Sequence, residues 1–260
     1  MKKNLEIMSL NIGNPSLERA KAQVKWLEAR QEDVFILTET KNSDGCNYIA
    51  DYFLGCRFDL FTLGTDKKYN VFFPKSQTGD LGVMIISKLP LKNSYSIFDQ
   101  NNIYFSRFAG CDIEFCGIDM HLIGLYVPSR DRSDEKVARK KVFCIDVAKH
   151  IKSIRDEKSC IICGDLNILE RNHIPHYTTF FEWEYAFYDF FSKNDFVDTF
   201  KFCNPNSIEH SWVGRTNDGY RYDYCFTSKK MENKIIKSFY FHEPRGTFTD
   251  HSAIMLEISI

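Results

Sequence analysis

The feature that most constrains this chain is a set of polar residues at the edges of apolar, strand-like runs. The residues at these edges are Asn11, Glu39, Asp165, Asn167, Asp223, Asp250 and His251. A carboxylate beside an apolar strand is costly unless it is paired or binds a metal. Because residues at strand ends can converge on one rim of a sheet, we expect these side chains to meet.

A rim of this composition favours a particular chemistry. Carboxylates and amides suit a hard divalent cation, and the whole set suits a phosphate ester bound beside it. Each local pattern also has a plain alternative. Asp165-x-Asn167 is a common turn, Glu39 is compatible with a surface carboxylate, and Asp250-His251 with an ordinary loop pair.

Composition predicts one folded domain spanning residues 1–260. Hydrophobic residues make up 43% of the 260 and aromatic residues 15%, which is enough for a substantial core. The net charge of −1 gives no overall signature of nucleic-acid binding. A basic cluster within residues 130–141 is compatible with a solvated helix face or with a binding surface.

The cysteines and the apolar segments bear on the compartment. Nine cysteines are scattered along the chain, and Cys160 and Cys163 lie in an apolar run, where we interpret them as small buried residues. This pattern fits a reducing compartment better than a disulfide framework. No apolar stretch has the length of a signal peptide or membrane span. We therefore expect a soluble, cytoplasmic monomer that does not bind membranes.

Hydrophobic periodicity predicts alternating strands and helices. Helices are expected at residues 17–30 and 180–193. A third, long helix is expected to start near residue 133, with a core-facing apolar stripe that extends to Ile154. Strands are expected at residues 5–11, 34–38, 69–73, 81–87, 103–108, 116–125, 160–163, 210–213, 220–227, 234–241 and 253–258. The strands of the middle region, residues 58–126, read as antiparallel hairpins. The fold class expected is α/β, a four-layered αββα sandwich of two mainly antiparallel mixed sheets with helices outside.

The ordered motifs resemble those of the endonuclease/exonuclease/phosphatase superfamily, and within it the exonuclease III-type apurinic/apyrimidinic endonucleases. The resemblance runs almost from end to end. The motifs that carry it are residues 10–12 (Leu-Asn-Ile), 38–41 (Thr-Glu-Thr-Lys), 81–90, 125–128 (Leu-Tyr-Val-Pro), 164–168 (Gly-Asp-Leu-Asn-Ile), 198–206, Trp212, 219–224 and 249–251 (Thr-Asp-His).

The resemblance implies a metal site and its ligands. Glu39 would be the principal ligand of Mg²⁺, assisted by Asp250 and Asn11, with Mn²⁺ as an alternative ion. Gly13 stands where the repair enzymes commonly carry a second aspartate.

The resemblance also implies the catalytic roles. Asp165 would orient or deprotonate the attacking water, and Asn167 and Tyr126 would hold the phosphate. His251, steadied by Asp223, would bind a nonbridging oxygen in the transition state. In-line attack on a phosphodiester needs charge neutralisation and a positioned water, which agrees with these roles.

Substrate contacts are expected on two sides of the rim. Trp212, Tyr220 and Tyr222 are candidates to line a sugar pocket. Arg130 and Arg132, in the loop after Tyr126, are candidates to grip backbone phosphates.

The leading hypothesis is a Mg²⁺-dependent phosphodiesterase that acts on nucleic acid, most favourably DNA, as an endonuclease or 3′-exonuclease of repair type. One alternative is a phosphatase or phosphodiesterase for a phospholipid head group or another small phosphate ester. A second alternative is a binding module that has lost the chemistry, although that module has no physical need for a full set of edge carboxylates.

Overall fold

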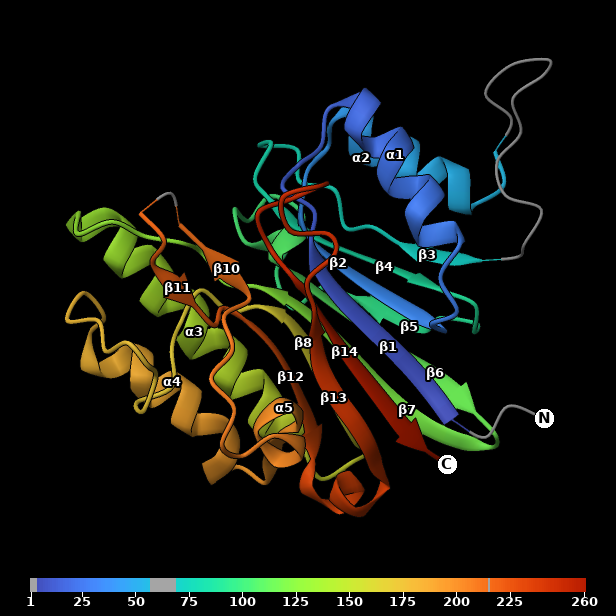
Figure 1. Ribbon diagram of the computed structural model, residues 1–260. Helices are drawn as coiled ribbons and strands as arrows, with labels where there is room; N and C mark the ends of the chain where they lie inside the picture. Colours follow the sequence, from blue (N-terminus) through green and yellow to red (C-terminus); the bar gives the residue numbers. More distant parts are fainter. Residues whose placement is uncertain (1–3, 57–68, 215) are drawn as a thin grey trace.

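The computed structural model describes residues 4–56, 69–214 and 216–260, which form two stacked β-sheets with helices outside (Figure 1). In the described residues each large sheet has six strands. Their order is β13-β14-β1-β2-β4-β3 in the first and β5-β6-β7-β8-β12-β9 in the second. In both sheets the described pairings are antiparallel except for β1–β2 and β7–β8.

The strands and helices follow one another along both halves of the chain. The first sheet contains β1 (Asn4–Asn11), β2 (Val34–Thr40), β3 (Asn70–Phe72), β4 (Gly82–Ser87), β13 (Ile235–Phe241) and β14 (Ala253–Ser259). The second contains β5 (Lys92–Tyr95), β6 (Phe108–Phe115), β7 (Ile118–Tyr126), β8 (Ser159–Asp165), β9 (Phe196–Asp198) and β12 (Asp223–Ser228). A separate two-stranded sheet is formed by β10 (Trp212–Val213) and β11 (Gly219–Tyr220).

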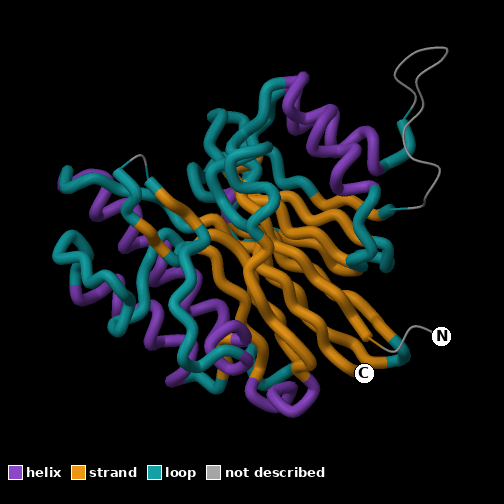
Figure 2. The backbone as a smooth tube through the Cα atoms, in the orientation of Figure 1, coloured by secondary structure: helices purple, strands orange, loops and turns teal. Residues whose placement is uncertain are grey.

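Helices cover the outer faces of the two large sheets, as Figure 2 shows in purple around the orange strands. They are α1 (Leu17–Glu28), α2 (Asp44–Phe53), α3 (Asp134–Ile154), α4 (Glu182–Lys193) and α5 (Thr199–Cys203), with short 3-10 helices η1 (Phe105–Arg107) and η2 (Lys229–Lys234). Within the described part of the chain, no helix is both long and apolar enough to cross a membrane.

Central strands such as β2 and β4 contain continuous apolar runs, because both of their faces are buried. Along β2, Val34 and Ile36 point into the core between the sheets. Phe35 and Leu37 point the other way and pack with α1 and α2 residues such as Val24 and Ile49. Because side chains alternate between the two faces of a strand, one strand contributes to the core between the sheets and to the core under the helices. This is the physical basis of the layered sandwich.

The structure confirms the predicted fold class and most of the predicted elements. Two predictions were wrong. Residues 103–108 form a turn and η1, and β6 begins only at Phe108. Residues 220–227 are divided between β11 and β12, which belong to different sheets. Helices α2 and α5 and strands β5, β6 and β9 were not predicted. Of these, α5, β5 and β9 have only three to five residues, too few to show a period. The predicted middle region begins with residues 58–68, which lie outside the described residues.

Candidate active site

The predicted rim exists because several strands reach the same edge of the sandwich. Asn11 ends β1 and pairs in register with Thr38 of the parallel strand β2. In the second sheet Asp165 ends β8 and stands opposite Asp223, the first residue of the antiparallel strand β12. Tyr126, the last residue of β7, also pairs with Asp165. Strand ends from both sheets thus bring polar side chains together.

Glu39 owes its direction to an irregularity in β2. The β2–β4 register shifts between Thr38 and Thr40, and Glu39 between them has a positive φ of 54°. A bulge of this kind re-aims one side chain within an otherwise regular strand. Glu39 is half-buried, and its carboxylate Oε1 accepts a hydrogen bond of 3.0 Å from the Tyr126 hydroxyl.

Three side chains converge closely enough to surround a small ion. In the described residues, one ligand atom each from Glu39, Asp165 and His251 lies within 4.8 Å of the others. Asp165 and His251 are buried. Glu39, Asp165 and His251 come from three strand edges that are far apart in sequence, so only the folded sandwich brings them together.

Asp165 is held from both sides. Its Oδ2 accepts a hydrogen bond of 2.9 Å from Asn11 Nδ2, and its Oδ1 accepts one of 2.9 Å from the backbone N–H of Asn167. Burial, with the negative charge of Asp223, raises the pKa of Asp165 to about 8. A carboxyl whose pKa lies near neutrality and whose two oxygens are fixed is suited to orienting or accepting a proton.

His251 and Asp223 form a buried ion pair. His251 Nδ1 lies 2.8 Å from Asp223 Oδ2. Burial by itself lowers the pKa of His251, but the charge and hydrogen bond of Asp223 outweigh it and raise the pKa to about 9. The imidazole is therefore cationic at neutral pH and presents its Nε2–H as a donor. Asp223 Oδ1 is buried without a hydrogen-bond partner among the described residues.

The charges at the rim fit a divalent cation. Glu39, Asp165 and Asp223 face the single positive charge of His251. Burial raises the pKa of Asp165, and this excess of carboxylates raises it further. Mg²⁺ is typically held by one or two carboxylates and otherwise by water and phosphate oxygens. Glu39 supplies such a carboxylate, whereas a protonated His251 is a donor rather than a ligand.

Asn11 also supports the neighbouring carboxylate. Its Nδ2 donates to Asp165, while its Oδ1 accepts a hydrogen bond of 2.9 Å from the Gly13 N–H. The amide thus holds Asp165 and the loop after β1, and its part in metal binding stays a prediction.

Asp250 also differs from expectation. It is exposed, and its Oδ2 accepts a hydrogen bond of 2.7 Å from Trp212 Nε1. Among the described residues it is outside the close group of ligand atoms, although it lines the same cleft as Glu39. Its part in metal binding stays a prediction.

Arg130 does not form the free basic surface that its loop position predicted. Its side chain is only 6% exposed and forms an ion pair with the fully buried Glu184. The guanidinium also donates to the Thr179 carbonyl and lies over the ring of Phe181. The neighbouring Arg132 is exposed, as predicted. A pairing with Glu184 was invisible in the sequence because 54 residues separate the two.

The predicted aromatic residues lie together beside the rim. Tyr220 and Tyr222 stack with ring centroids 5.1 Å apart, and Trp212 lies 5.4 Å from Tyr220 and 6.0 Å from Tyr222. Tyr177, which was not singled out, stacks on Tyr220 at 4.2 Å. Whether these rings contact substrate stays a prediction.

Two hollows flank the catalytic group. A cleft of about 670 Å³ is lined by residues that include Glu39, Asp250, Arg19 and Arg245. A smaller pocket of about 180 Å³ is lined by Ser129, Arg130, Lys140, Asn167, Thr179, Phe180, Glu184, Tyr220 and Tyr222. The arrangement offers an extended substrate a path across the rim.

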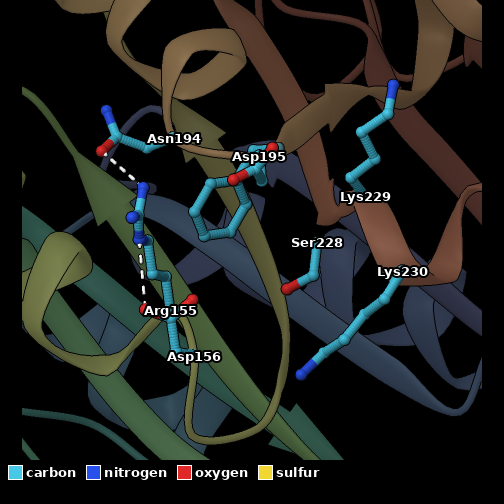
Figure 3. A pocket seen from close by; sticks show the side chains of 8 residues that line it. Arg155, Asp156, Asn194, Asp195, Ser228, Lys229 and Lys230 are labelled. Carbon is cyan, nitrogen blue, oxygen red and sulfur yellow. Dashed lines mark hydrogen bonds and ion pairs between the residues drawn. The ribbon is translucent and has the colours of Figure 1, made fainter.

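A further cavity lies at the opposite end of the second sheet. Its volume is about 340 Å³, and Figure 3 shows Arg155, Asn194 and Ser228 among its lining residues. Arg155 is tied to Asn194 at 2.9 Å. Ser228 ends β12, whereas Asp223 of the rim begins it, so this cavity is separated from the rim by the length of the strand.

Several supporting residues were missed at the sequence level. Ser211 Oγ accepts hydrogen bonds from the backbone N–H groups of Tyr222 and Asp223, at 2.9 and 3.0 Å, and so fixes the start of β12. Arg107 lies over the Tyr126 ring at 4.8 Å. Neither residue has a local signal, because each acts on a partner distant in sequence.

Comparison with known proteins fits this geometry. The profile of the Endonuclease/Exonuclease/phosphatase family matches residues 8–251. The chain belongs to this family. Among its relatives is an exodeoxyribonuclease of Bacillus subtilis (strain 168), 23% identical over 98% of this chain and 100% of that protein. Another is recombination repair protein 1 of Drosophila melanogaster, 24% identical over 99% of this chain but only 37% of that longer protein.

The solved structures extend the comparison to the fold. An AP endonuclease from Archaeoglobus fulgidus superposes with a TM-score of 0.80 at 19% identity, covering 98% of this chain and 100% of that one. At this identity the likeness establishes the sandwich fold. The resemblance inferred from the motifs is thereby confirmed at the level of family and fold.

Proposed function

We propose that this family member is a Mg²⁺-dependent nuclease that hydrolyses phosphodiester bonds in DNA, as a repair-type endonuclease or 3′-exonuclease. The observation that carries the proposal is the convergence of ligand atoms from Glu39, Asp165 and His251 within 4.8 Å, beside the hydroxyl of Tyr126. The names of the relatives, which include an exodeoxyribonuclease, a recombination repair protein and an AP endonuclease, support DNA as the substrate.

The attacking water is assigned to Asp165. Asn11 and Asn167 fix its two oxygens, so the carboxylate can hold one water in a single orientation. Its pKa of about 8 gives it enough basicity to accept the proton of that water as the bond to phosphorus forms.

The phosphate is assigned to His251 and its neighbours. Protonated His251, oriented by Asp223, donates to a nonbridging oxygen whose negative charge grows during attack. Glu39 would hold the divalent cation, with Asp250 of the same cleft as a second ligand, and the cation, when bound, would neutralise charge on the phosphate. Tyr126 orients Glu39 by its hydroxyl hydrogen bond and stands where it can also reach the substrate.

The test is a panel assay with Mg²⁺ on four substrates: an abasic duplex, single-stranded DNA, RNA and a soluble phosphate monoester. We expect cleavage of DNA that EDTA abolishes and that Glu39→Gln weakens most at low Mg²⁺. Cleavage of RNA alone would contradict the DNA assignment. Turnover of the monoester alone would move the protein to the phosphatase branch of its family, and inactivity on all four would indicate a binding module.

A further inference from the structure

A buried charged network connects the small pocket to the catalytic rim. Lys140 of α3 is 1% exposed and Glu184 of α4 is fully buried, and their charged atoms lie 2.6 Å apart. Arg130 pairs with the same carboxylate, which also accepts a hydrogen bond of 2.9 Å from the Phe181 N–H. One carboxylate thus ties together the loop after β7, helix α3 and the start of α4.

Lys140 has a second partner that Arg130 lacks. Its Nζ donates to the backbone carbonyl of Asn167 at 2.5 Å. Asn167 has a positive φ of 48°, a left-handed conformation that asparagine adopts more readily than most other residues. Its side-chain Nδ2 donates to the Val127 carbonyl at 3.0 Å, and its N–H donates to Asp165.

We infer that Lys140 is a positioning residue, which acts on the reaction through the backbone of Asn167. The ammonium group fixes the Asn167 carbonyl, and the same peptide segment fixes both the Asn167 amide and the carboxylate of Asp165. A fully buried lysine is expensive to keep charged, and Glu184 supplies the compensating charge. The inference rests on the proposed nuclease activity.

The first variant is Lys140→Met, which keeps the bulk of the side chain but removes the donor to Asn167. Glu184 then still has Arg130 as its counter-charge, so the protein is expected to fold. Displacing a catalytic segment by about an ångström costs on the order of 10²-fold in rate. We therefore expect kcat on DNA to fall about 10- to 100-fold while KM stays nearly unchanged. Lys140→Arg keeps a charged donor and is expected to restore part of the loss.

A double-mutant cycle on kcat tests whether Lys140 acts through Asn167. If it does, Lys140→Met loses part of its effect in an Asn167→Ala background, because the side-chain amide is gone while the backbone carbonyl and N–H remain. Arg130→Met is the matched comparison: it removes the other cation from Glu184 without touching Asn167. Its effect is expected to multiply with that of Asn167→Ala.

Losses from Lys140→Met and Asn167→Ala that simply multiply would overturn the inference, as would a wild-type kcat in Lys140→Met. If Lys140→Met does not fold, as judged by circular dichroism and its urea transition, Lys140→Leu, which also lacks a donor, enters the same cycle with the same expected outcome. An inactive wild-type chain would instead refute the proposed function, so the two failures are distinguishable.

Discussion

Two buried charged clusters meet at the start of β12, on either side of Tyr222, and they differ in how their charges balance. The structural cluster consists of Glu170, Asp198, Lys201, Arg221 and Tyr224. The active-site cluster consists of Glu39, Asp165, Asp223 and His251. The first matches two carboxylates with two cations, whereas the second sets three carboxylates against one imidazole.

The structural cluster shows what charge balance achieves in a protein core. Arg221 Nε lies 3.0 and 3.1 Å from the two oxygens of Glu170, and its Nη2 lies 2.8 Å from Asp198. Tyr224 donates to Glu170 at 3.1 Å. Burial by itself raises the pKa of Glu170, but the charge and hydrogen bonds of Arg221 outweigh it and hold the pKa below its usual value. The charged form of Glu170 is therefore stabilised without a further ligand.

In the active-site cluster the balance is missing. The pKa of Asp165 is raised to about 8, and Asp223 Oδ1 has no hydrogen-bond partner among the described residues. Two clusters with similar residue types thus differ in purpose. Balanced charges stabilise the fold, and an excess of carboxylates reserves a place for a cation and a substrate.

The largest effect is expected from Asp165→Asn in the active-site cluster. The amide cannot accept the proton of the attacking water, so kcat on DNA should fall about 10²- to 10⁴-fold. The free energy of unfolding without metal should stay the same or rise, because one of the repelling carboxylates is neutralised. Single-turnover kinetics and urea unfolding measure the two quantities, and near-normal kcat would remove Asp165 from the chemistry.

The structural cluster should show the opposite pattern. Arg221→Met leaves the buried Glu170 and Asp198 poorly compensated and should lower the free energy of unfolding by about 3–5 kcal/mol. Arg171→Met is the control, because Arg171 pairs with Glu182 and Asp189 at an exposed position and its loss should leave the urea midpoint nearly unchanged. Equal urea midpoints for the two variants would contradict the contrast between the clusters.

The third expected effect is a pH dependence of the free energy of unfolding that arises from the active-site cluster. The pKa of Asp165 rises from an ordinary 3.8 to about 8 on folding, so the folded chain binds this proton more tightly than the unfolded chain. Stability without metal should therefore fall as the pH rises from about 4 to 8, relative to Asp165→Asn. One pKa unit corresponds to about 1.4 kcal/mol, and we expect at least this difference. Mg²⁺ should reduce this pH-dependent difference in stability between the wild type and Asp165→Asn. A pH-independent difference in thermal unfolding would be evidence against charge excess at the rim.

The smallest effect is expected from the exposed Arg132. If it contacts a backbone phosphate, Arg132→Gln should reduce the slope of log K against log salt by about 0.7–0.9. Hydrolysis of a small phosphodiester should not change. Fluorescence anisotropy with labelled DNA at several salt concentrations measures the slope. An unaltered slope would leave Arg132 as a solvated charge.

The sequence was sufficient for what is encoded locally. The apolar run of residues 34–38 predicted a buried strand, which the structure confirms. A stripe of Leu17, Ala20, Val24 and Leu27 predicted a helix; the structure buries the last three and leaves Leu17 40% exposed. Asn11, Glu39, Asp165 and His251 lie at the ends of predicted strands. Because strand ends can meet at one rim of a sheet, the sequence also predicted that these residues converge. Family and fold were both predictable on these grounds.

Only the tertiary structure decided what each of these side chains does. Arg130 pairs with Glu184, Asn11 donates to Asp165, and Lys140 donates to the Asn167 carbonyl. These partners are 27 to 154 residues apart, so no local period or propensity records them. A buried charge must find a counter-charge or a hydrogen bond wherever the fold supplies one. That partner is chosen by packing in three dimensions, which a one-dimensional pattern does not contain.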